Sequence, residues 1–160
     1  MSAADILDLS WVIPALPLTG AIFLLLLGKR LGEPKSGWLA VVMMALAFLG
    51  SVATFLALQS LPSDERLHTN QLFTWISSGA FEVKFGMLTD PLSVIMILFV
   101  TGIGTLIHIY AIGYMHGDAR FSRFFAYLNL FACAMLVLVL SSSLLGTFMG
   151  WEGVGLCSYL

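Results

Sequence analysis

The sequence predicts an all-α polytopic membrane protein with about five transmembrane helices. Of its 160 residues, 59% are hydrophobic and only 10% are charged, whereas soluble domains carry about 25% charged residues. Long apolar stretches follow one another along the chain, and a membrane-spanning helix needs about 20 such residues. No soluble core could bury so much apolar surface, so most of the chain is expected to lie in a lipid bilayer. The net charge of −2 and the scattered basic residues argue against a nucleic-acid partner.

Five apolar segments are the candidates for membrane-crossing helices. They cover residues 7–27, 38–58, 92–113, 124–140 and 144–160. The fifth is still apolar at Leu160, so we expect residues 1–160 to be the N-terminal portion of a larger helical subunit. The first segment has no basic residue before it and no clear small-residue cleavage site, which argues against a signal peptide. Cys133 and Cys157 lie within apolar segments and are expected to be small packing residues.

The charges of the loops predict the orientation of the chain. The first and third loops hold five basic residues, namely Lys29, Arg30, Lys35, Arg120 and Arg123. The second loop holds only two basic residues, Arg66 and Lys84, and several acidic residues accompany them. By the positive-inside rule, the first and third loops are therefore cytoplasmic, and the N-terminus and the second loop face the outer side.

The second loop, residues 59–90, has room for structure outside the membrane. Phe81, Val83 and Phe85 alternate with polar or small residues after Gly79, and further apolar residues precede this glycine. Alternation next to a glycine turn predicts a β-hairpin on the outer face. The aromatic side chains could equally be anchors at the membrane interface. Because an isolated hairpin is marginally stable in water, this one should dock on other loops or on another subunit.

Glu152 is the only charged residue of the segment 144–160 and lies eight residues past Leu144. At about 1.5 Å per residue it lies roughly 12 Å into a hydrocarbon core about 30 Å thick. A carboxylate at that depth costs on the order of 3 kcal/mol and needs a partner, a water-filled cavity or a proton. We expect Glu152 to be a proton carrier, and a structural hydrogen bond between helices is the alternative. Gly146 and Gly150 form a small-xxx-small pair, which predicts close helix packing.

Other polar residues of the apolar segments have plainer interpretations. His108 lies near the cytoplasmic end of the third segment, where we expect it to be within reach of water. It is a possible proton relay, because histidine titrates near neutral pH, and an ordinary interfacial histidine is the alternative. Asn129 is expected to form a hydrogen bond between helices. Thr101 and Thr105 are expected to bond their own helix backbone.

Three runs of the sequence resemble the large antiporter-like subunit of respiratory complex I, which is subunit L in bacterial NADH–quinone oxidoreductase and subunit 5 in mitochondria. They are HIYAIGYM at 108–115, RFFAYLNLF at 123–131 and GWEGVGLCSY at 150–159, and the junction Asp90-Pro91-Leu92-Ser93 fits the same family. The resemblance implies a proton-translocating membrane-arm subunit of the bacterial inner membrane, with a periplasmic N-terminus. It further implies that the subunit couples quinone reduction to proton pumping, with the other membrane-arm subunits, the lipid bilayer and protons as its partners.

The resemblance also implies a role for Glu152, which in this family pairs with a lysine on a later helix. A cation about 4 Å away contributes roughly 4 kcal/mol at an effective dielectric constant of 20, so its movement would switch Glu152 between releasing and binding a proton. The chain has no cysteine array, haem motif or nucleotide fingerprint. We therefore expect no cofactor or metal in it, and FMN, iron–sulfur clusters and quinone in partner subunits. A subunit of a multisubunit cation/proton antiporter, or of a related hydrogenase or carbon-uptake complex, is the second interpretation. A membrane scaffold is the third.

Overall fold

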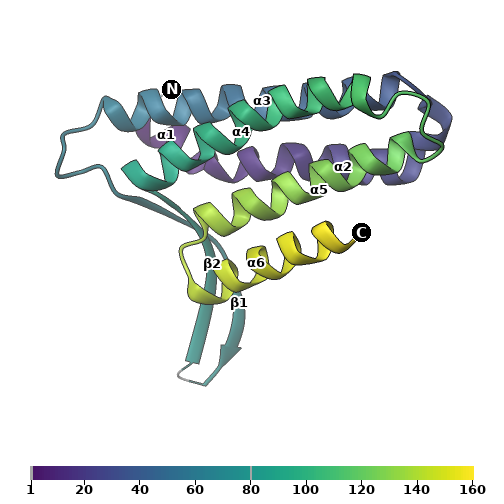
Figure 1. Cartoon of the computed structure of the whole chain (residues 1–160). Helices are drawn as coiled ribbons and strands as arrows, with labels where there is room; N and C mark the ends of the chain where they lie inside the picture. The colour runs from purple at the N-terminus through teal and green to yellow at the C-terminus, as the bar shows by residue number, and fades with distance from the viewer. Residues whose placement is uncertain (1, 80) are drawn as a thin grey trace.

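The computed structural model describes residues 2–79 and 81–160 and is mostly helical (Figure 1). A short helix α1 (Ala3–Asp8) and a 3-10 turn η1 (Leu9–Trp11) lead into α2 (Val12–Leu31). The remaining helices are α3 (Lys35–Gln59), α4 (Pro91–Tyr114), α5 (Phe121–Leu140) and α6 (Leu144–Tyr159). Together with the two-stranded hairpin between α3 and α4, these elements confirm the predicted fold class.

The four long helices form an antiparallel bundle, and α6 lies outside it against α5 (Figure 1). Within the bundle, α2 packs on α3 and α5, and α3 packs on α4. The buried apolar residues form one cluster around Ile97 and Leu136 near the hairpin and another around Leu24 and Phe125 towards the opposite end. The outward faces of the helices also carry apolar residues, such as Leu106, which is 66% exposed. Apolar surface on both sides of a helix suits a bundle that is surrounded by lipid.

Four helical stretches of the described residues are long and apolar enough to cross a membrane: Ala3–Leu31, Lys35–Gln59, Pro91–Tyr114 and Phe121–Leu140. They contain the first four predicted segments. The fifth segment also forms a helix, α6, which covers 16 residues up to Tyr159. The first four helices extend past the apolar segments by one to a few residues, and at α4 a polar cap marks the start. Asp90 accepts the Ser93 backbone N–H at 2.8 Å, so α4 begins at Pro91.

The predicted hairpin is confirmed, with β1 (His68–Ser78) antiparallel to β2 (Phe81–Thr89). Gly79 adopts a φ of 60°, a left-handed conformation that glycine tolerates. The hairpin projects away from the bundle, with its base beside the start of α6 (Figure 1). The base is fixed at two places. His68 Nε2 lies 2.8 Å from Asp8 Oδ1, and the Ser142 backbone N–H donates to Gly86 O at 3.0 Å.

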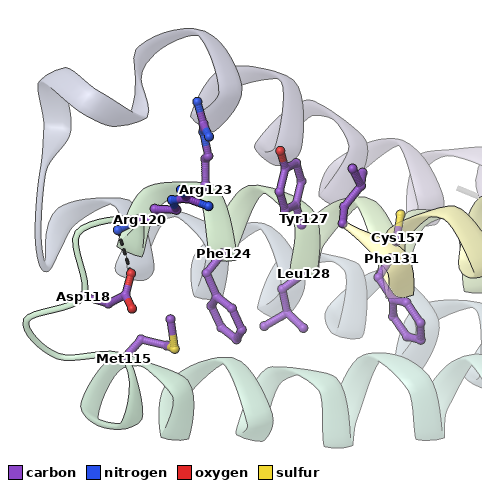
Figure 2. A pocket seen from close by; sticks show the side chains of 10 residues that line it. Met115, Asp118, Arg120, Arg123, Phe124, Tyr127, Leu128, Phe131 and Cys157 are labelled. Atoms are coloured by element: carbon purple, nitrogen blue, oxygen red, sulfur yellow. Dashed lines mark hydrogen bonds between the residues drawn. The ribbon is translucent and has the colours of Figure 1, made fainter.

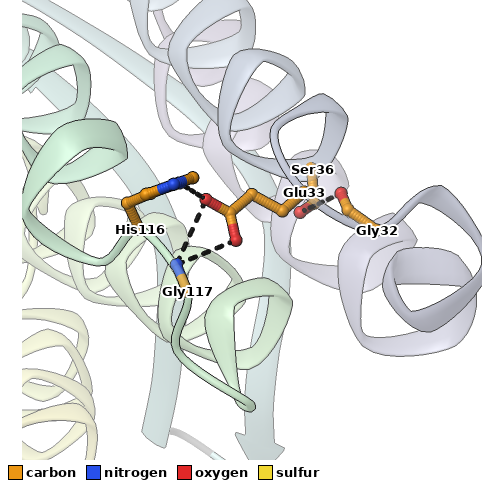
Figure 3. Close-up of polar contacts among 5 residues, drawn as sticks. All are labelled: Gly32, Glu33, Ser36, His116 and Gly117. Atoms are coloured by element: carbon orange, nitrogen blue, oxygen red, sulfur yellow. Dashed lines mark hydrogen bonds and ion pairs between the residues drawn. The ribbon is translucent and has the colours of Figure 1, made fainter.

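At the end opposite the hairpin, the first and third loops contact each other (Figure 3). The Glu33 carboxylate is in contact with the His116 ring and accepts the Gly117 backbone N–H at 3.1 and 3.3 Å. The contact between Asp8 and His68 brings the N-terminal helix and the hairpin base together at the other end. The two groups of loops that the charge pattern assigns to opposite sides of the membrane therefore lie at opposite ends of the bundle.

Candidate functional site

One face of α6 is built from glycines and packs directly on α5. Gly146 and Gly150 are buried, and a Cβ atom added at Gly150 would lie only 2.6–2.8 Å from the N, Cα and Cβ atoms of Leu138. A Cβ added at Gly153 would lie 3.0 Å from the Cβ of Ala134. The prediction of close packing through small residues is confirmed. The backbones of α5 and α6 approach each other at a distance that only glycine permits.

Glu152 lies on the face of α6 that points away from α5. It follows Gly150 by two positions, which is a rotation of about 200° around the helix, and its side chain is exposed. Phe148 and Leu156, each four positions away, are also exposed, at 59% and 56%, so they flank the carboxylate on the same face. No hydrogen bond or ion pair to Glu152 forms within residues 2–79 and 81–160. A carboxylate therefore stands alone in the centre of an apolar surface.

His108 lies inside the bundle, and the prediction that it is within reach of water is wrong. The residue is 2% exposed. Its Nδ1 lies 2.7 Å from Gly104 O on α4, and its Nε2 lies 2.9 Å from Asn129 Oδ1 on α5. The prediction used only the position of His108 near the end of its segment. The side chain faces α5 and is enclosed there, with its ring centroid 6.4 Å from that of Phe125.

Asn129 forms the hydrogen bond between helices that the sequence predicts, and its partner is His108. Its amide Nδ2 is buried and has no partner among the described residues. This atom lies against Gly20 of α2, where an added Cβ would collide with it. Sequence reasoning missed this arrangement of Gly20, His108 and Asn129, because the three residues come from three different helices.

The two threonines of α4 bond their own helix backbone, as predicted. Thr101 Oγ1 donates to Ile97 O at 2.6 Å, and Thr105 Oγ1 donates to Thr101 O at 2.7 Å. Thr101 also bonds Ser51 Oγ of α3 at 3.2 Å. Ser122 Oγ of α5 donates to Gly28 O of α2 at 2.9 Å and lies 3.1 Å from Ser36 Oγ of α3. Of these polar contacts between helices, the one at His108 contains a group of a type that titrates near neutral pH.

A cavity of about 450 Å³ opens between α5 and α6 near the loop that precedes α5 (Figure 2). Arg120 and Arg123 lie at its loop end, and Phe124 and Phe131 form part of its apolar wall. Asp118 Oδ1 accepts the Arg120 backbone N–H at 2.6 Å, which orders the loop ahead of α5. Within the described part of the chain, no three His, Cys, Asp or Glu side chains are close enough together to hold a metal ion.

Glu152 and His108 occupy different environments. His108 is enclosed between α4 and α5 and has two polar neighbours, whereas Glu152 is on the outer face of α6. No hydrogen bond joins the two side chains in the described residues. Of the two candidate residues that the sequence predicts, His108 lies at the interface between α4 and α5 and Glu152 lies on the outer face of α6.

Comparison with known proteins identifies relatives of the chain. Residues 75–125 match a family profile described as the N-terminus of NADH-ubiquinone oxidoreductase (complex I) chain 5. The chain is 45% identical over 145 residues to NADH-quinone oxidoreductase subunit L of Escherichia coli K12, a match that covers 91% of this chain and 23% of the relative. It is 46% identical over 153 residues to subunit L of Mycobacterium tuberculosis, with 94% and 24% covered.

A eukaryotic relative shows the same partial coverage. NADH-ubiquinone oxidoreductase chain 5 of Dictyostelium citrinum is 39% identical over 145 residues, which cover 91% of this chain and 21% of the relative. The chain thus spans about a quarter of the length of the curated relatives it matches. His108 lies inside the region matched by the family profile, Asn129 lies four residues past its end, and Glu152 lies further beyond it. By these comparisons the chain corresponds to the N-terminal portion of NADH-quinone oxidoreductase subunit L and chain 5, the family that its sequence predicts.

Proposed function

We propose that this chain is the N-terminal part of a proton-translocating subunit in the membrane arm of a respiratory NADH:quinone oxidoreductase. The whole subunit couples quinone reduction to proton pumping, beside other membrane-arm subunits in the inner membrane of a bacterium. FMN, the iron–sulfur clusters and quinone bind to partner subunits. The similarity to subunit L over more than nine-tenths of the chain supports this function, as do four helices that are able to cross a membrane.

The observation that carries the proposal is the lone carboxylate of Glu152. It is exposed on the apolar outer face of α6, where lipid or another helix must cover it. In an apolar environment the protonated form is favoured, and a nearby cation favours the ionised form. A lysine or arginine brought to this face from elsewhere in the assembly would therefore control whether Glu152 holds a proton. Carboxylates inside membranes commonly belong to such proton pathways.

His108 is a second proposed member of the pathway, since it is the titratable polar group enclosed at the α4–α5 interface. The two residues would act at separate stages, because no described contact links them. A structural role alone would be served equally well by groups that cannot titrate, such as the pair formed by Thr101 and Ser51 in the same bundle.

Loss of the full-length subunit tests this function against its main alternative. Membrane vesicles whose only NADH oxidase is this enzyme should lose NADH-driven proton uptake when the gene is deleted and recover it when the gene is restored. An antiporter subunit would behave differently: deletion would remove proton exchange driven by a sodium gradient and leave NADH-driven uptake unchanged. That second pattern would refute the proposal, and no change in either activity would favour the scaffold interpretation.

We also propose that the N-terminus and the hairpin face the periplasm. The test uses one cysteine at Ser63, which is exposed beside the hairpin, and another at Ala119, which is exposed in the third loop. Both native cysteines are replaced, and Ser36 is avoided because it is buried. In intact cells, an impermeant thiol reagent should label position 63 at once and position 119 only after lysis. The reverse pattern would invert the orientation.

A further inference from the structure

The ring of His108 faces two oxygen atoms. Nδ1 lies 2.7 Å from Gly104 O, and Nε2 lies 2.9 Å from Asn129 Oδ1. A neutral imidazole has one N–H and can donate to only one of these oxygens, whereas an imidazolium donates to both. The neutral ring fits the site only if the Asn129 amide group rotates by about 180° (a half-turn), so that its Nδ2 donates to the unprotonated Nε2. Each protonation state of His108 therefore requires its own orientation of Asn129.

The surroundings of the amide permit both orientations. Asn129 is fully buried, and with Oδ1 on His108 its Nδ2 has no partner among the described residues. An unpaired buried N–H is costly, and the half-turn would give this group the His108 ring as its acceptor. The other end of the amide lies against Gly20, which has no side chain to block either atom. With the charged ring, both N–H groups of His108 have acceptors and the Nδ2 of Asn129 has no partner among the described residues. With the neutral ring and the turned amide, Nδ2 has the ring as its acceptor and Oδ1 lies beside Gly20.

Among the buried residues of the four bundle helices, no charged side chain is present to influence the protonation state of the His108 ring. The buried residues of α2, α3, α4 and α5 include no Asp, Glu, Lys or Arg, and Cys133 on α5 is the only titratable one besides His108. The partners of the ring are the Gly104 carbonyl on its own helix, Asn129 across the interface and Phe125 beside it. Of these groups, only the amide of Asn129 can exchange an acceptor for a donor.

We propose that Asn129 is the positioning residue of His108 and that the two form a two-state proton site. When a proton arrives on the Nε2 lone pair, an N–H bond forms there and the amide presents Oδ1. When the proton leaves, the amide turns and presents Nδ2. Throughout, Nδ1 stays protonated and its N–H donates to Gly104 O, and no other covalent bond changes. This inference deepens the proposed function, on which it rests for the source and the destination of the proton.

The test compares the charge state of the His108 ring in wild type and variants. Solid-state nitrogen NMR of isotope-labelled histidine distinguishes the neutral ring from the imidazolium. The sample is the full-length subunit in its assembled complex in lipid, and subtraction of a His108→Gln spectrum isolates this ring. Wild type should change from imidazolium to the neutral ring protonated at Nδ1 as the pH rises. Asn129→Asp supplies a permanent acceptor, so it should move this change to higher pH by at least about one unit.

Two further variants perturb the amide in other ways. Asn129→Leu removes the acceptor, so the imidazolium should be lost at lower pH than in wild type. Gly20→Ala adds a methyl group against the amide and should also change the pH at which the ring becomes neutral. Gly50→Ala, whose added Cβ would lie 3.3 Å from Ile13 and meet no polar group, is the matched control and should titrate like wild type. The Asp and Ala variants keep the test decisive if the Leu variant does not assemble.

The outcomes separate the pairing from the proposed function. If the ring titrates at the same pH in wild type, Asn129→Asp and Gly20→Ala, Asn129 does not position His108 and the inference is refuted. The pH profile of NADH-driven proton uptake is then measured for the same samples. Shifted ring signals support the pairing whatever this profile shows. If the ring signals shift and the pH profile of proton uptake does not, the result contradicts a proton route through His108. That route belongs to the proposed function and not to the pairing.

Discussion

Glu152→Gln in the full-length subunit is expected to reduce NADH-driven proton uptake by on the order of tenfold or more, with the amount of assembled complex largely kept. Glutamine retains the size and hydrogen-bonding capacity of glutamate but can neither carry a proton nor pair with a cation. Because Glu152 is on the outer face of α6 and has no described partner to lose, the substitution should not disturb the α5–α6 interface. Electron transfer that is coupled to pumping should fall with it.

The measurement is dye-reported proton uptake by inverted vesicles, normalised to the complex present on a native gel. Glu152→Asp is the companion variant, and it should be milder because it keeps the titrating group on a shorter side chain. A purely structural role for Glu152 predicts the opposite order, since glutamine could still form a bond between helices. Near-normal pumping by Glu152→Gln at normal assembly would refute the role as a proton carrier.

Gly150→Ala should greatly reduce the amount of stable subunit. The added Cβ would lie 2.6–2.8 Å from the N, Cα and Cβ atoms of Leu138, and backbone atoms cannot move aside as the end of a flexible side chain can. Overpacking of this kind costs about 1–3 kcal/mol, and here it separates the two helices along their contact. The assembled complex and its thermal stability in detergent are the quantities to measure.

Gly155→Ala is the matched control for that prediction. It lies on the same helix, and a Cβ added there meets nothing within 4 Å in the described structure. This variant should assemble like wild type, helped slightly by the higher helix propensity of alanine. If both variants were equally stable, the glycine face of α6 would not determine how α6 packs on α5.

The fold was largely predictable because the signals for it are local in the sequence. An apolar run of about 20 residues is enough to indicate a spanning helix, and alternation around Gly79 indicates the hairpin. Glu152 was equally visible, since one charge in an apolar run needs no knowledge of neighbours. The face of α6 on which it lies was not visible, because that depends on which side packs against α5. The bounds of the first four helices also differed, since these helices extend past their apolar segments.

Contacts between distant parts of the chain were the part that sequence reasoning could not reach. The prediction that His108 is within reach of water was wrong, because the position of a residue along a helix does not show whether its side chain points into the bundle or out of it. Asn129 is 21 residues away from His108, and His116 is 83 residues away from Glu33. With a single sequence, no pattern connects such pairs. Their side chains meet only because the bundle brings α4 beside α5 and the first loop beside the third.

The lone carboxylate of α6 has a consequence for biosynthesis. The chain is made from its N-terminus, and no group in the described residues ahead of Glu152 pairs with it. Only Ser141–Ser143 separate α5 from α6, so the two helices enter the bilayer nearly together. In the proposed function the counter-charge of Glu152 comes from another part of the assembly, so at roughly 5–20 residues per second of synthesis α6 would be made before it is paired. Lipid tolerates a neutral carboxylic acid better than a carboxylate, so under the proposed function the first proton bound by α6 would enter the membrane during insertion and not during pumping.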